Sequence, residues 1–167
     1  TEAYIKATEI NPYFAEAFYN LGVALAEQSK LQDAMSAYKK AIALTPDYVE
    51  VYINMGNILE SQGKLDDAIA AYSEAIFLKP DYAEAYNNLG LVLYNEGKQG
   101  LPVCNFKKSI VLNPCDSMAF MNIGISLSDS KQHRHAIKMY LRSIAINPFN
   151  DQAYNSLSKW ISDSRNE

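Results

Sequence analysis

The chain contains 167 residues, 49% of them hydrophobic and 20% charged, which is ordinary for a globular protein of one domain. Its net charge of −4 argues against a nucleic-acid partner, because a protein that binds nucleic acid usually presents a basic face. No apolar run approaches the roughly 20 residues that a membrane-spanning helix needs, so we expect no membrane role.

The first predicted element is a helix within residues 1–14. Tyr4, Ala7 and Pro12 have the spacing that recurs at the end of each later segment, where a second helix is predicted. We therefore interpret residues 1–14 as the second helix of a partial repeat whose first helix is missing. Its apolar stripe lacks a covering partner, although terminal repeats normally need a polar outer face. Either a longer protein continues upstream, or this helix packs against another molecule, such as a second copy in a homo-oligomer.

Four consecutive segments of 34 residues follow, and they share one apolar skeleton: residues 15–48, 49–82, 83–116 and 117–150. In the first segment Phe18, Leu21, Gly22 and Leu25 follow at i, i+3, i+4 and i+7, which is one face of a helix. A second stripe at helical spacing comes later in each segment. The glycine recurs in all four segments and lacks a Cβ, so we expect the second helix to approach the first closely there.

The junctions between segments carry predicted helix stops and starts. Pro46 and Pro80 end one helix, because the residue before a proline is forced out of the helical conformation. Asp47 and Asp81 follow as predicted N-caps, each with a Glu three residues later at the spacing of a capping box.

The third segment departs from the pattern at the start of its second helix. Gly97, Gly100 and Pro102 crowd this region, and Pro102 replaces the alanine of the other segments. Proline is tolerated in the first turn of a helix but not deeper. We therefore expect a second helix that starts late or bends.

A last helix is predicted within residues 151–167, with a polar outer side that covers the end of the chain. The residues predicted for its core side are Tyr154, Leu157 and Ile161.

The recurring aromatic residue, apolar–Gly pair, alanine, second aromatic residue and proline, at a period of 34, resemble the tetratricopeptide repeat. The resemblance implies an all-α fold, a right-handed α-solenoid of stacked antiparallel helix pairs, in a single domain of residues 1–167. It also implies a module that binds other proteins rather than an enzyme.

The sequence offers no catalytic signature. It has no Gly-rich phosphate loop, no CxxC pair and no HExxH motif, and its Ser, His and acidic residues are not grouped by their spacing. Cys104 and Cys115 are predicted to be reduced thiols, one packed in a helix and one in a turn, which indicates a cytoplasmic location. We expect no catalytic residue, no metal site and no cofactor.

One polar residue recurs at position 6 of every complete segment, counted from its first residue: Asn20, Asn54, Asn88 and Asn122. At about 100° per residue, this position points away from the apolar stripe. Four amides in a row would suit the N–H and C=O groups of an extended peptide. The alternative is that each asparagine bonds to the neighbouring repeat and serves only the scaffold.

These asparagines resemble the asparagine ladder of O-linked N-acetylglucosamine transferase, and that resemblance implies a concave groove that holds the backbone of a bound peptide. Other side chains predicted on the same outer side would complete the groove: Tyr19, Asn57, Asn87, Leu91, Tyr94 and Met121. Because the groove is acidic and lacks a cluster of Lys and Arg, we expect an extended partner that is neutral to basic. Two alternatives stay open, a substrate-recruiting arm of a larger enzyme such as a glycosyltransferase and a self-assembling scaffold.

Overall fold

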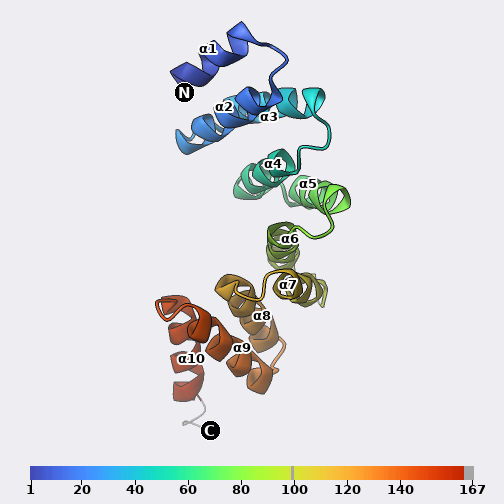
Figure 1. Ribbon diagram of the computed structural model, residues 1–167. Coiled ribbons are helices and arrows are strands. Elements are labelled where there is room, and N and C mark those ends of the chain that lie inside the picture. Colours follow the sequence, from blue (N-terminus) through green and yellow to red (C-terminus); the bar gives the residue numbers. More distant parts are fainter. Residues whose placement is uncertain (99, 164–167) are drawn as a thin grey trace. The chain divides into compact units, whose positions relative to one another are not determined.

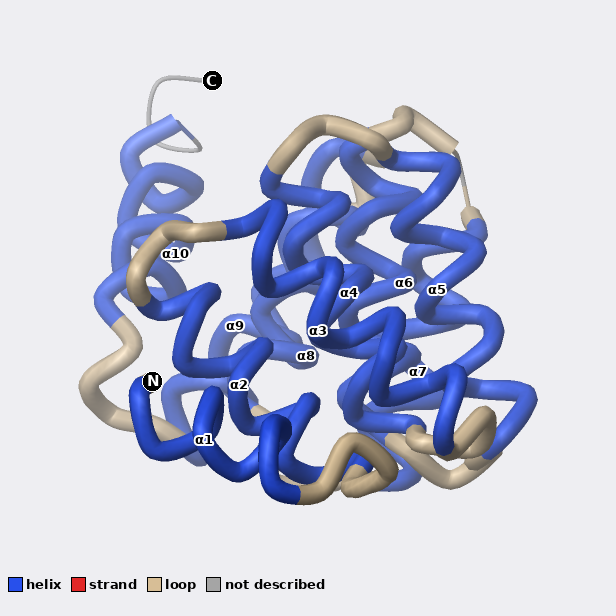
Figure 2. The backbone as a smooth tube through the Cα atoms, turned by 90° about the horizontal axis from the view of Figure 1, so that it is seen from above, coloured by secondary structure: helices blue, strands red, loops and turns tan. Residues whose placement is uncertain are grey.

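The computed structural model describes residues 1–98 and 100–163, with side chains as far as Trp160, and within them it contains ten α-helices and no strand (Figures 1 and 2). The helices are α1 (Glu2–Ile10), α2 (Ala15–Glu27), α3 (Leu31–Leu44), α4 (Val49–Ser61), α5 (Leu65–Leu78), α6 (Ala83–Asn95), α7 (Leu101–Leu112), α8 (Ser117–Asp129), α9 (His133–Ile146) and α10 (Asp151–Asp163).

The helices form two compact units, Thr1–Pro80 with α1 to α5 and a second that begins at Asp81 with α6 to α10. Within the first unit α2 packs on α3 and α4 packs on α5, while α3 also contacts α4. The second unit has the same order, because α6 packs on α7, α8 packs on α9, and α7 contacts α8. The predicted all-α solenoid of helix pairs is confirmed.

Close contact between the two helices of each pair depends on the recurring glycine. A Cβ built on Gly22 would lie 2.3 Å from a ring carbon of Tyr38, and one on Gly56 would lie 2.4 Å from the ring of Tyr72. Gly90 and Gly124 face aromatic rings in the same way. Carbon atoms normally pack at about 3.5–4.0 Å, so no residue with a Cβ fits unless the ring moves. The predicted close approach at these glycines is confirmed.

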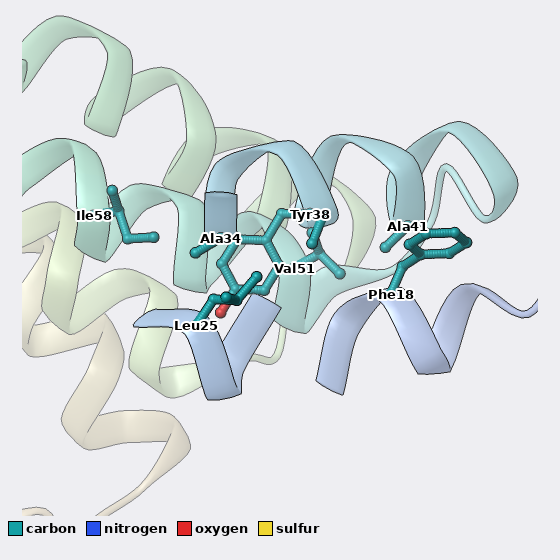
Figure 3. Packing of buried hydrophobic residues seen from close by; sticks show 8 residues of the cluster. Phe18, Leu25, Ala34, Tyr38, Ala41, Val51 and Ile58 are labelled. Atoms are coloured by element: carbon teal, nitrogen blue, oxygen red, sulfur yellow. The ribbon is translucent and has the colours of Figure 1, made fainter. Parts of the chain in front are cut away.

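The core of the first unit joins side chains from three helices (Figure 3). Tyr38 of α3 is 1% exposed and lies among side chains of α2 and α4, and Val51 of α4 is fully buried beside it. Val51 occupies position 3 of its repeat, and the residues at this position in every first helix and in α10 are buried: Ala17, Val51, Ala85, Ala119 and Ala153. A first helix therefore has a buried side beyond the single stripe that the sequence predicted, because it packs on more than its own partner helix.

The predicted N-caps at Asp47 and Asp81 are wrong. Helices α4 and α6 have Tyr48 and Tyr82 at the N-cap, and neither start has a side-chain cap hydrogen bond. The aspartates stand one residue too early to reach the first amides. At the start of α8 an aspartate does stand at the N-cap, where Asp116 accepts hydrogen bonds from the backbone N–H groups of residues 118 and 119.

The irregular third repeat keeps both helices, as expected. Its second helix, α7, begins later in the repeat than α3, α5 and α9 do, and Pro102 lies in its first turn. Gly100 provides the N-cap with φ of 79°, a left-handed conformation that glycine adopts without strain. The predicted late start is confirmed.

Two packing predictions fail near the surface. Tyr154 was expected in the core of the last helix but is 46% exposed, because Ala153 takes the buried position of α10. Leu157 is half-buried, and the side chain predicted at Ile161 lies outside the described residues. Cys104 was expected to pack inside α7, but both it and Cys115 are exposed free thiols. No helix among the described residues is long and apolar enough to cross a membrane.

Candidate functional site

The candidate site is the surface that the first helices present at and around position 6, within each unit separately. Asn20 on α2, Asn54 on α4 and Asn88 on α6 are half-buried, as side chains beside a solvent-facing surface would be. Asn122 on α8 is only 4% exposed. Three of the four asparagines therefore keep partial access to solvent, and the fourth does not.

In the first unit, the asparagine row is connected to aromatic side chains. The Nδ2 of Asn54 donates a hydrogen bond of 3.4 Å to the hydroxyl of Tyr19, which belongs to the preceding repeat. The Tyr19 ring lies 5.0 Å from the ring of Tyr48 and 6.3 Å from that of Tyr38, measured between centroids. Ring pairs at this separation attract each other beyond simple area burial. The predicted site residue Tyr19 therefore contacts Asn54, Tyr48 and Tyr38.

A second contact ties the site surface to the interior of its own repeat. The hydroxyl of Tyr72, on α5, donates a hydrogen bond of 2.8 Å to Oδ1 of Asn57, and the same hydroxyl lies 3.2 Å from Oε2 of Glu60. Tyr72 is fully buried. Asn57 is therefore an exposed site residue whose side-chain amide is oriented by a hydrogen bond from the buried Tyr72.

In the second unit, the site residues are packed more deeply than the sequence predicted. Nδ2 of Asn122 donates a hydrogen bond of 3.1 Å to Oδ1 of Asn87. Met121 was expected to line the groove but is 2% exposed, so no peptide can reach it in this arrangement. The physical reason is that α8 contacts both α6 and α10, which leaves less of its surface to solvent. Leu91 on α6 is half-buried and stays within reach of the surface.

Tyr94, also on α6, forms a hydrogen bond to the Asp129 carboxylate at the end of α8. This bond, together with burial of the hydroxyl, raises the pKa of Tyr94 to about 12, since the protonated phenol is the form that can donate. A cavity of about 630 Å³ adjoins the pair and is also lined by Lys98 and Ser126. The raised pKa reflects this hydrogen bond, in which the phenol donates to the carboxylate.

Three of these contacts share one register. Asn54 with Tyr19, Asn122 with Asn87 and Asp129 with Tyr94 each join residues 35 apart in the chain. Side chains at the same level of successive first helices therefore touch, as the scaffold alternative predicted for the asparagines. Each asparagine contact uses one N–H of a side-chain amide that has two donors and an acceptor oxygen.

Sequence reasoning missed the aromatic residues that stand directly before three of the first helices: Phe14, Tyr48 and Tyr82. Their recurrence at one repeat position was a visible signal, hidden by the expectation of a small polar N-cap there. Within the described residues, no group of three or more His, Cys, Asp and Glu side chains is arranged to hold a metal ion.

Three family models of the tetratricopeptide repeat match the chain. The TPR repeat model matches residues 24–63 and 56–97, and two models described as tetratricopeptide repeat match residues 3–35 and 119–150. Together they account for residues 3–97 and 119–150, which is most of the chain. A search of curated protein sequences finds no match.

Solved structures share the fold over nearly the whole chain. The crystal structure of MamA is 26% identical over 88% of this chain and 86% of that chain, with a TM-score of 0.80. The pilF protein of Pseudomonas aeruginosa is 25% identical over 97% of this chain and 75% of that chain, with a TM-score of 0.85. Such helical repeats are a protein-interaction fold. By its repeated sequence, its helix pairs and these matches, the chain belongs to the tetratricopeptide repeat family.

Proposed function

We propose that this chain is a non-catalytic protein-interaction module that binds an extended peptide along its first helices. The observation that carries the proposal is the partial exposure of the position-6 asparagines within each unit, Asn20 on α2 and Asn54 on α4 in the first and Asn88 on α6 in the second. The amides of Asn54 and Asn122 use one N–H each toward the neighbouring repeat. Asn54 is half-buried, so its second N–H and its amide oxygen stay within reach of a peptide, whereas Asn122, at 4% exposed, offers none of its amide atoms.

The spacing of the repeats supports an extended partner. Packed helices lie about 8–10 Å apart, and an extended chain rises about 3.3 Å per residue. Successive first helices within one unit would therefore meet the peptide backbone about every third residue. The asparagine ladder that this row resembles, in O-linked N-acetylglucosamine transferase, grips a peptide backbone in the same manner.

Affinity from such contacts would be modest and largely independent of sequence. A hydrogen bond contributes about 0.5–1.5 kcal/mol net, so a few amide contacts leave selectivity to the side chains around them. The proposed contact residues for the partner's side chains are Tyr19 and Asn57 in the first unit and Asn87, Leu91 and Tyr94 in the second. Acidic side chains near these residues favour a neutral to basic peptide: Glu16 and Glu50 in the first unit and Asp129 in the second.

The test uses peptides selected against the intact chain from a random 12-residue display library, with affinity measured by fluorescence anisotropy. The variants are Asn54→Ala alone and Asn54→Ala combined with Asn88→Ala. We expect the combination to weaken the selected peptides about tenfold, and Asn54→Ala alone to move the urea unfolding midpoint little, because the Asn54 bond to its neighbour is long at 3.4 Å. Asn105→Ala is the control, since this half-buried asparagine lies on α7, a second helix, outside the row.

An opposite pattern would refute the proposal. If the double variant unfolds at clearly lower urea and binds the peptides normally once folded, the asparagines serve the scaffold alone.

A second candidate function is self-association through α1, and a specific observation favours it. No residue of α1 is buried, and its apolar side chains Tyr4, Ile5 and Ile10 are 40%, 43% and 76% exposed. A mostly apolar cavity of about 280 Å³ lies beside Ile5. Light scattering over a concentration series, with Ile5→Glu as the comparison, tests this candidate, and a strict monomer at all concentrations would rule it out.

A further inference from the structure

A cavity of about 570 Å³ lies between the N-terminal ends of α2 and α4, within the first unit. Its lining combines aromatic rings with carboxylates: Tyr13, Phe14, Ala15, Glu16, Thr45, Asp47, Tyr48 and Glu50. We call this cavity the aromatic–acidic pocket. Tyr13 and Phe14 are 83% and 45% exposed, although large aromatic side chains usually seek burial. The pocket adjoins the candidate site, because the Tyr48 ring packs at a tilt of 38° against the ring of Tyr19.

The three carboxylates of the pocket have no cationic partner within the described part of the chain. Glu16, Asp47 and Glu50 form no ion pair there, and no Lys, Arg or His is among the residues that line the cavity. Asp47 is also not engaged in capping α4, whose N-cap is the neighbouring residue and has no side-chain bond. Three acidic residues therefore line one cavity, and no cationic side chain lines it with them.

Helix ends supply only part of the missing positive charge. Each helix N-terminus carries roughly half a positive charge, and two of them, those of α2 and α4, adjoin the pocket. Against three carboxylates this leaves a local charge of about −2. The nearby carboxylates act on Tyr48 as well, since burial, Tyr19, Glu16 and Glu50, in that order, raise the pKa of its hydroxyl. A positively charged occupant would relieve this repulsion.

The lining also indicates which kind of cation fits. Lys and Arg side chains are attracted to aromatic faces within about 6 Å of the ring centre, and both form charge-assisted hydrogen bonds with carboxylates. A bare metal ion is not favoured, because these acidic residues are not arranged as a metal-binding group. The pocket thus combines the two features that recognise an organic cation on a side chain.

We propose that the aromatic–acidic pocket binds a Lys or Arg side chain of the protein partner. The inference deepens the proposed function, since it assigns a side-chain contact beside the surface that would hold the peptide backbone. It does not depend on the asparagine row, because the pocket residues and the row are different side chains.

The experiment is an NMR titration of the intact ¹⁵N-labelled chain with Nα-acetyl-arginine methylamide. The matched ligand is the citrulline analogue, which has nearly the same shape and no charge. We expect the arginine compound to shift backbone amides of residues 13–16 and 45–50, and the citrulline compound to bind at least about tenfold more weakly. Such small ligands bind with modest affinity, which this method detects.

Variants locate the effect. Glu16→Gln combined with Glu50→Gln should weaken the arginine compound about 3- to 10-fold, given the usual strength of exposed ion pairs. Tyr13→Ala should weaken it about 2- to 5-fold through loss of a ring face, and its high exposure makes damage to the fold small. Glu84→Gln is the control for each of the two glutamate substitutions, because it removes one carboxylate at the same repeat position on α6, outside the pocket lining.

Three results would each refute the proposed binding of Lys or Arg in this pocket. They are equal binding of the arginine and citrulline compounds, amide shifts confined to other residues, and an equal loss of affinity in Glu84→Gln. The two proposals fail separately. If the asparagine substitutions leave peptide affinity unchanged while the arginine compound still binds, only the proposed role of the asparagine row is refuted. If the asparagine substitutions weaken peptide binding but the arginine compound does not bind, only the pocket proposal is refuted.

Discussion

Replacing Ser109 and Ser143 with alanine, one at a time, should change the stability of the second unit in opposite directions. The two serines occupy the same repeat position, on α7 and α9, and both are fully buried. The Ser143 hydroxyl donates a hydrogen bond of 2.8 Å to the carbonyl oxygen of Ser117 and accepts one of 2.9 Å from Nδ2 of Asn150. The Ser109 hydroxyl has no hydrogen-bond partner within the described part of the chain.

The magnitudes follow from these partners. A buried polar group without a partner costs about 1–3 kcal/mol, and alanine favours a helix over serine by a few tenths of a kcal/mol. Ser109→Ala should therefore raise the free energy of unfolding by about 1 kcal/mol, after a small loss for the space left by the oxygen. Ser143→Ala removes two hydrogen bonds and leaves Nδ2 of the buried Asn150 without this partner. It should therefore lower the free energy of unfolding by about 1–3 kcal/mol.

Urea unfolding followed by circular dichroism measures both variants against the parent chain. Because both substitutions are in the same unit and have the same chemistry, the difference between their midpoints cancels most effects on the unfolded state. The slope of the transition should stay unchanged. If Ser109→Ala destabilises the chain as much as Ser143→Ala does, the buried hydroxyl of Ser109 stabilises the fold and the expected contrast between the two serines is refuted.

Three further predictions concern helix starts, helix packing and titration. Asp116→Ala should lower the free energy of unfolding by about 0.5–2 kcal/mol, because the Asp116 side chain caps α8. Asp47→Ala removes no cap and should change the free energy of unfolding by less than about 0.5 kcal/mol. Thermal melts that show equal losses of stability in the two variants would contradict this. Gly56→Ala should destabilise by about 1–3 kcal/mol despite the better helix propensity of alanine, because its Cβ would lie 2.4 Å from a ring atom; an unchanged urea midpoint would refute the close contact. NMR titration of Tyr94 should give a pKa of about 12, and Asp129→Asn should return it toward the ordinary value of 10.0. Because the folded-state pKa is the higher one, the associated stability is complete below pH 10.0 and is lost as the pH rises toward 12.

The sequence by itself determined the architecture. A period of 34 residues occurs four times without an insertion, and each segment contains two apolar stripes at helical spacing. Because each apolar stripe must be covered by another, this pattern predicts pairs of packed helices. The glycine at each close approach and the late start of α7 were likewise predictable, since the absence of a Cβ and the geometry of proline act locally.

The asparagine row was only partly predictable. Its recurrence was visible in the sequence, but a helical wheel gives only the direction in which a side chain leaves its own helix. It cannot show that Asn54 reaches Tyr19 of the preceding repeat or that Asn122 is enclosed beside Asn87. These contacts join residues 35 apart, and they exist only because successive first helices lie next to each other.

Helix caps and pockets needed the tertiary structure for the same reason. A shift of one residue separates Asp116, which reaches the first amides of its helix, from Asp47, which does not. The aromatic–acidic pocket joins two helix starts that are distant in the chain, so neither segment alone indicates it. Local patterns fixed which helices form, because helix formation depends on neighbours three and four residues away, whereas the packing of one helix on the next decided which side chains meet.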